Sequence, residues 1–154
     1  MIMTDNQIGV MNDLAKEIHD SNVLAGWWTD LKFKEKKQSL LDKGFDEATV
    51  DAIFDTLNIK ESTLETRNVG ELLCLTHSEL SEAMEGYRKK LMDDKLPHRT
   101  MFETELADVF IRLFDIVGSR RIDIGTIIAE KRQYNAQRAD HKPENRVKEG
   151  GKQF

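Results

Sequence analysis

Hydrophobic residues recur at steps of three and four along most of this chain, which is the spacing that places them on one face of an α-helix. The first periodic segment runs from about Asp5 to Leu24, and Thr4 or Asp5 can cap its start. Further helices are predicted at about 30–43, 46–57, 68–92, 99–118 and 123–139. Because no segment shows convincing strand alternation of hydrophobic and polar residues, we expect an all-α protein.

The two long helices at 68–92 and 99–118 carry hydrophobic rows on what we expect to be their inner faces. The row of the first helix consists of Val69, Leu73, Thr76, Leu80, Ala83 and Tyr87. The row of the second consists of Phe102, Leu106, Val109, Phe110, Leu113 and Val117. Pro97 breaks the short linker between them. The spacing therefore predicts an antiparallel hairpin within an antiparallel helical bundle.

The length of 154 residues suits one domain. We assign residues 1–141 to a single all-α domain and expect the polar segment 142–154 to be a mobile tail. The one cysteine, Cys74, excludes an internal disulfide framework. Its apolar neighbours Leu73 and Leu75 predict that the thiol is buried.

Charge and hydropathy limit the partners of the chain. A net charge of −5 offers no basic footprint for a nucleic-acid polymer, although it is compatible with a small nucleotide carried with a metal ion. No window approaches the roughly 18 apolar residues of a membrane span. The N-terminal residues lack the basic and apolar pattern of a signal peptide. We therefore expect a cytoplasmic protein that binds neither nucleic-acid polymers nor membranes.

Two acidic pairs are the strongest candidates for chemistry. Glu79 and Glu82 lie three residues apart on one predicted helix, and Glu105 and Asp108 repeat this spacing on the next. If the helices pack as a hairpin, four carboxylates converge, and their mutual repulsion favours a cation between them. Oxygen-only ligands suit Mg²⁺ or Mn²⁺. The pattern alone does not distinguish this metal site from an ordinary solvated acidic surface.

Other metal sites fit the sequence poorly. A di-iron bundle needs Glu-x-x-His on two helices. The four histidines, His19, His77, His98 and His141, never have that spacing. No paired His or Cys spacing supports a catalytic zinc site either.

The last predicted helix changes character along one face. Its row begins with Ile124 and Ile128 and continues with Lys131, Asn135 and Arg138. One interpretation is a helix that leaves the core at its C-terminal end, where cations suit the helix dipole. The other is a phosphate clamp, with two cations and an amide.

Two adjacent tryptophans, Trp27 and Trp28, follow the first helix. Because both rings have large apolar surfaces, they are not expected to be fully exposed together. They can pack in a core or an oligomer interface. Alternatively, one ring can stack on a nucleobase while Asn22, one turn earlier, forms hydrogen bonds with the base edge.

Together these residues resemble the MazG-like, all-α nucleoside triphosphate pyrophosphohydrolases. The family hallmark is Glu-Glu-x-x-Glu on one helix and Glu-x-x-Asp on the next; here "SELSE" and "ELAD" supply the two acidic pairs. The resemblance includes "HSELSEAMEGYRK", "AGWW" and "KRQYNAQR" and covers about residues 5–32 and 67–141. Ser78 stands at the position of the first glutamate, so no metal role is assigned to it. We interpret the segment at about 33–66 as an inserted helical hairpin beside four core helices.

The resemblance implies Mg²⁺-dependent cleavage of a (d)NTP between its α- and β-phosphates, giving the monophosphate and pyrophosphate; Mn²⁺ is a possible substitute. It implies that Glu79, Glu82, Glu105 and Asp108 hold the metal and direct a water to phosphorus. Lys131, Asn135 and Arg138 are expected to bind the leaving pyrophosphate. Asn22 with Trp27 or Trp28 is expected to hold the base. The family also implies a homo-oligomer, a dimer or a tetramer.

Two alternatives remain at this point. The same fold can act on another nucleotide, such as phosphoribosyl-ATP or a nucleoside diphosphate. The chain can also be a non-catalytic helical interaction or regulatory module that carries the acidic pairs as surface charge.

Overall fold

The computed structural model describes residues 3–64, 67–139 and 142–147, and these residues are helical with short connections. The prediction of an all-α protein is confirmed, and the described residues contain only two isolated β-bridges, Thr29 with Ser62 and Met92 with Thr100. The helices are α1 (Asp5–Leu24), α2 (Phe33–Asp42), α3 (Glu47–Thr56), α4 (Val69–Lys89), α5 (Met101–Ser119), α6 (Ile124–Gln137) and α7 (Pro143–Arg146).

Side-chain caps explain where the main helices begin. Thr4 and Thr100 each form a capping box, in which the threonine oxygen accepts from the third residue of the helix and that residue's side chain accepts from the threonine N–H. Asn68 caps α4 and Asp123 caps α6. Residues that satisfy the first N–H groups of a helix can be recognised in the sequence, which is why the predicted starts lie close to the observed ones.

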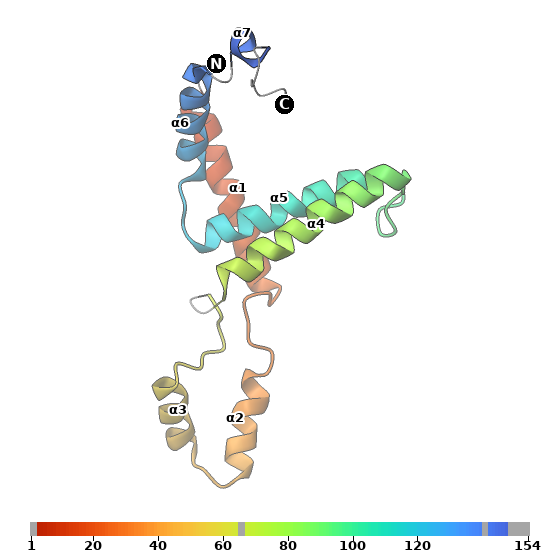
Figure 1. The fold of residues 1–154 in the computed structure, drawn as a ribbon. Coiled ribbons are helices and arrows are strands. Elements are labelled where there is room, and N and C mark those ends of the chain that lie inside the picture. Colours follow the sequence, from red (N-terminus) through yellow and green to blue (C-terminus); the bar gives the residue numbers. More distant parts are fainter. Residues whose placement is uncertain (1–2, 65–66, 140–141, 148–154) are drawn as a thin grey trace.

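Helices α4 and α5 form a long antiparallel hairpin, and α1 crosses it (Figure 1). Helix α6 packs along α1, on the part of α1 that lies away from the hairpin (Figure 1). Glycines allow these helices to approach closely: a Cβ on Gly118 would lie 2.5 Å from the Ala15 carbonyl oxygen, and one on Gly125 would lie 2.3 Å from that of Ile8. The hairpin and α1 thus form the scaffold of the molecule.

The predicted inner row of α4 is wrong by one residue at three positions, where Leu72, Glu79 and Gly86 are buried in place of Leu73, Leu80 and Tyr87. The buried residues of this helix are Leu72, Thr76, Glu79, Ala83 and Gly86, at steps of four and three. Thr76 and Ala83 were predicted correctly. The small side chains in this row permit close packing, and a Cβ on Gly86 would lie only 2.9 Å from Met101. Glu79 therefore occupies a core position of the hairpin.

Several of the large apolar side chains that were predicted to face inward point outward instead. Leu73, Leu80 and Tyr87, predicted to face inward, are exposed. The same correction holds for Phe102, Phe110 and Leu113 of α5. Cys74, predicted to be buried, is exposed as well. Helix α4 thus buries Leu72 together with small residues and Glu79, and the hairpin leaves an apolar face exposed among the described residues.

Helices α2 and α3 form a hairpin that extends away from the other helices on two connecting segments (Figure 1). Its centre is formed by the buried residues Val50 and Phe54, and the ring of Phe33 packs edge-on against Phe54 at 5.3 Å. Gly44, with φ of +92°, adopts the left-handed conformation that ends α2. A helical hairpin was predicted here, and its role as an insertion stays a prediction.

The C-terminal segment was predicted to be a mobile tail. Its start contains the short helix α7, which the sequence did not predict. His141 and residues 148–154 lie outside the described part of the chain. Within that part, none of the helices combines the length and the apolarity needed to cross a membrane.

Candidate metal and nucleotide site

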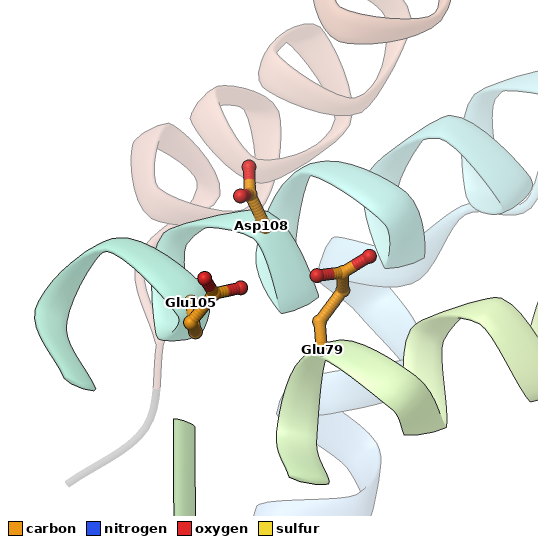
Figure 2. A group of neighbouring side chains, drawn as sticks. All are labelled: Glu79, Glu105 and Asp108. Atoms are coloured by element: carbon orange, nitrogen blue, oxygen red, sulfur yellow. The ribbon is translucent and has the colours of Figure 1, made fainter. Parts of the chain in front are cut away.

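Three carboxylates meet between α4 and α5. One side-chain oxygen each of Glu79, Glu105 and Asp108 lies within 4.8 Å of the other two. Glu79 extends from α4 toward α5, while Glu105 and Asp108 extend from α5 (Figure 2). The exposed fraction of Glu79 is only 8%. Because an ionised carboxylate is costly to bury without a compensating charge, this arrangement differs from an ordinary solvated acidic surface.

The fourth predicted carboxylate lies beside this group. Glu82 is exposed and is not among the three residues whose oxygens converge. Its charge nevertheless acts on Glu105. The structure thus brings together three of the four residues predicted as metal ligands and leaves the fourth, Glu82, outside the converging group.

The environments of Glu105 and Asp108 favour the protonated forms of these two carboxyl groups. Burial raises the pKa of Glu105 from its ordinary value of 4.5 to about 7, and a hydrogen bond with Glu79 and the charges of Glu82, Glu79 and Asp108 act in the same direction. Burial and the charge of Glu79 also raise the pKa of Asp108, against the lowering effect of Arg112. A divalent cation among these oxygens would relieve the repulsion, and an all-oxygen donor set suits Mg²⁺ or Mn²⁺.

Arg112 is the cation paired with this cluster. Its Nε donates to Oε1 of Glu79 at 2.6 Å, and its Nη2 lies 2.5 Å from the same oxygen. Arg112 follows Asp108 by four residues and Glu105 by seven, so all three lie on one face of α5. Arg112 was not among the predicted site residues, although this spacing was a signal that could have identified it.

A pocket of about 190 Å³ adjoins the cluster. Its lining residues are Asn22, Trp27, Arg67, Leu72, Asp108, Ile111, Arg112, Asp115 and Ile116. Ligand pockets typically measure about 300–1,000 Å³. The pocket therefore has room for part of a nucleotide, with two carboxylates and two guanidinium groups at its wall.

Trp28 belongs to the core rather than to this pocket. Its ring is 1% exposed, and its Nε1 donates to both carboxylate oxygens of Asp115, at 3.0 and 3.1 Å. Nδ1 of His19 lies 2.7 Å from Oδ1 of Asp115, and the His19 ring packs edge-on against Trp28. The guanidinium of Arg67 lies over the Trp28 ring, 5.3 Å from its centroid. The predicted stacking of Trp28 on a base is corrected, because its faces are covered by the protein.

Trp27 has the opposite environment. Its exposed fraction is 63%, and it lines the pocket together with Asn22. Nη1 of Arg67 donates to the Trp27 carbonyl oxygen at 2.6 Å, which holds this backbone against the start of α4. Of the two tryptophans, Trp27 is therefore the one whose ring is available to a ligand.

The predicted phosphate clamp lies elsewhere in the chain. Lys131 is exposed and lies over the ring of Tyr134, and Asn135 and Arg138 follow toward the end of α6. Because α6 packs along α1, a single chain does not bring these three residues to the carboxylates (Figure 1). Oδ1 of Asn135 is buried without a hydrogen-bond partner among the described residues. The arginines that line the pocket are Arg67 and Arg112 instead, and Arg112 also contacts the cluster.

The pKa of Glu105 predicts how the stability of the metal-free protein depends on pH. Between pH 4.5 and 7 the folded chain binds more protons at this residue than the unfolded chain. Its contribution to the free energy of unfolding is therefore complete below pH 4.5 and is lost as the pH rises through 7. We expect the melting temperature of wild type, relative to that of Glu105→Gln, to fall between pH 5 and 8. An equal pH dependence in the two proteins would contradict this prediction.

Comparisons with known proteins do not assign the chain to a family. No protein-family model matches the sequence, and neither a curated protein nor a solved structure matches it. The geometry of the acidic cluster and its neighbouring pocket is therefore the basis on which a function can be inferred.

Proposed function

We propose that this protein is a divalent-metal-dependent nucleoside triphosphate pyrophosphohydrolase that cleaves a (d)NTP to the monophosphate and pyrophosphate. The observation that carries the proposal is the convergence of Glu79, Glu105 and Asp108 beside a pocket with two arginines and an exposed tryptophan. Carboxylates that hold a metal and cations that bind phosphate are the two parts that a metal–polyphosphate substrate requires. The resemblance of both acidic pairs to the MazG-like hallmark supports the same activity.

Each part of the site has a role in this reaction. A bound Mg²⁺ would neutralise charge on the polyphosphate and lower the pKa of the attacking water. Glu79, Glu105 and Asp108 would hold the ion from two helices. Arg67 and Arg112 would bind phosphate oxygens in the pocket.

The base would lie at the other side of the pocket. The exposed ring of Trp27 offers a stacking surface, since each base has a π-face. The amide of Asn22 can donate to and accept from a base edge. Because a stacking ring and an amide can bind any of the bases, these contacts do not select one base.

A hydrolysis screen tests the activity. The protein is incubated with each NTP and dNTP, with nucleoside diphosphates and with phosphoribosyl-ATP, in the presence of Mg²⁺, and released pyrophosphate and phosphate are measured separately. We expect pyrophosphate and a monophosphate from at least one triphosphate, and none after removal of Mg²⁺ with EDTA. If only phosphoribosyl-ATP or a nucleoside diphosphate is hydrolysed, that compound rather than a triphosphate is the substrate. No turnover of any nucleotide would favour a non-catalytic helical module.

We further propose that the active form is a homo-oligomer, in which the exposed face of the α4–α5 hairpin packs against the same face of a second copy. Leu73, Leu80, Met84 and Tyr87 follow one another on α4 at steps of seven, four and three, which is the spacing of helices that pack in bundles. The rings of Tyr87 and Phe102 lie 5.3 Å apart, so the apolar rows of the two helices adjoin.

The size of this face also favours a second copy. Its exposed large residues are Val69, Leu73, Leu80, Met84, Tyr87, Phe102, Phe110 and Leu113. A half-exposed aromatic side chain alone leaves roughly 100 Å² open, and monomers rarely expose a contiguous apolar patch beyond about 300–600 Å². Two such hairpins related by a twofold axis would form a four-helix bundle with the same surface on both sides.

Met84→Glu tests this interface, because a charge in the centre of the bundle would be desolvated without a partner. Light scattering after size-exclusion chromatography should give at least twice the mass of one chain for wild type and the mass of one chain for the variant. Leu57→Glu, at an exposed apolar residue after α3, is the matched control and should remain oligomeric. A wild type that is monomeric at micromolar concentration would refute the interface.

A further inference from the structure

The ion pair between Arg112 and Glu79 spans the border between the carboxylates and the pocket. Both N–H contacts of the guanidinium go to a single oxygen, Oε1 of Glu79. Glu79 is buried, whereas the Arg112 side chain is 36% exposed. Arg112 also lines the pocket together with Asp108, Trp27 and Asn22. One guanidinium therefore serves as counter-charge to the cluster and forms part of the wall where the nucleotide would bind.

Arg112 and a divalent cation have overlapping roles at Glu79. In the metal-free chain the guanidinium compensates a buried carboxylate that would otherwise be unpaired. A divalent ion held by Glu79, Glu105 and Asp108 would provide more charge than Arg112 at the same place. It would also repel the guanidinium, because like charges at such short range oppose each other. Metal binding therefore weakens the contact that keeps Arg112 on Glu79.

We propose that Arg112 is a displaceable counter-ion, which holds Glu79 before metal binding and binds a phosphate group of the nucleotide once the metal has taken Glu79. The inference rests on the proposed pyrophosphohydrolase activity and adds an order of events to it. Nucleotide phosphate is the partner that the released guanidinium can reach, since Arg112 already borders the pocket. Arginine suits this role, because its planar fork binds carboxylate and phosphate oxygens alike.

This role predicts opposite effects on two affinities. Without nucleotide, Mn²⁺ no longer has to displace the guanidinium in Arg112→Gln, so its dissociation constant should fall about three- to tenfold. With Mn²⁺ present, the same variant lacks a charge-assisted hydrogen bond to phosphate, so nucleotide affinity should decrease about tenfold or more. An arginine that only orients Glu79 for the metal would instead cause Mn²⁺ binding to weaken in the variant.

Isothermal titration of the full-length protein measures both affinities. Mn²⁺ is titrated first without nucleotide. The second titrant is the α,β-methylene form of whichever nucleotide is hydrolysed fastest in the screen, with Mn²⁺ saturating. Arg88→Gln removes an exposed arginine from α4, and both affinities should stay within about twofold of wild type. Arg112→Lys keeps the charge without the fork and should change both affinities in the same directions as Arg112→Gln, but less.

The outcomes separate the two proposals. A wild type that does not bind Mn²⁺ would overturn the proposed function and this inference with it. Mn²⁺ binding that is weaker in Arg112→Gln than in wild type, or nucleotide binding that is unchanged, would overturn the role of Arg112 alone. If circular dichroism shows that Arg112→Gln does not fold, Arg112→Lys provides the test. Tighter Mn²⁺ binding together with weaker nucleotide binding in Arg112→Lys would support the role of Arg112, and the opposite change in either affinity would overturn it.

Discussion

Asp108→Asn is expected to abolish pyrophosphate release while the protein stays folded. The change keeps the size of the side chain but removes one of three converging negative charges. A catalytic metal ion contributes several kcal/mol to transition-state stabilisation. Because each 1.36 kcal/mol corresponds to a factor of ten, its loss should lower the rate by about a thousandfold. Pyrophosphate release from the best substrate and Mn²⁺ affinity are the measurements.

Two further variants make this result specific. Glu85→Gln, at a partly exposed residue paired with Lys89 on α4, removes a charge outside the cluster and should keep activity close to that of wild type. Glu82→Gln should have an effect between the two, because Glu82 interacts electrostatically with Glu105 but lies outside the converging group.

The fold and the site are tested together by this set. Circular dichroism should show the same helical signal in all three proteins, since Asp108 is not among the buried core residues of α5 and the isosteric change leaves packing intact. Unchanged turnover in Asp108→Asn would refute the metal site. Equal loss in Glu85→Gln would show that the effect is general electrostatics rather than metal coordination.

Trp28→Ala and Trp27→Ala are expected to have opposite consequences, although the residues are adjacent. Trp28 is enclosed by His19 and Arg67 and bonded to Asp115. Its truncation removes a large core side chain and one donor to a buried carboxylate. The free energy of unfolding should fall by about 3–5 kcal/mol, as measured by urea denaturation.

Trp27→Ala should leave the free energy of unfolding within roughly 1 kcal/mol of wild type, since an exposed ring adds little to packing. Its expected effect is on nucleotide affinity, which should fall by about 1–3 kcal/mol if the ring stacks on the base. Titration with the α,β-methylene nucleotide measures this. Equal destabilisation by both substitutions would contradict the assignment of one ring to the core and the other to the pocket.

Much of the fold follows from local features of the sequence. Periodicity and caps predicted α1 from Asp5 to Leu24 and placed the ends of the other main helices within a few residues of the observed ones. These features depend on residues within one or two turns, so they can be recognised without knowing what the helix touches. The four-residue helix α7 was missed, because so short a segment has no periodic pattern.

The orientation of each helix within the hairpin could not be predicted in this way. Successive residues are separated by about 100° around a helix, so the rows through Leu80 and through Glu79 lie on adjoining faces. From the sequence, the larger apolar residues were predicted to form the inner row. The structure packs α4 on α5 through Thr76, Ala83 and Gly86, because small residues allow the closest approach.

The sequence by itself determined the all-helical class, most helix ends and the two acidic pairs at a spacing of three. Only the tertiary structure decided that Glu79 is buried, that Arg112 is its partner, that Trp27 rather than Trp28 faces the pocket, and that the cationic end of α6 lies elsewhere in the chain. The physical reason is that the spacing of residues along a helix determines only which of them share a face. Which surface that face meets depends on the packing of segments far apart in the chain.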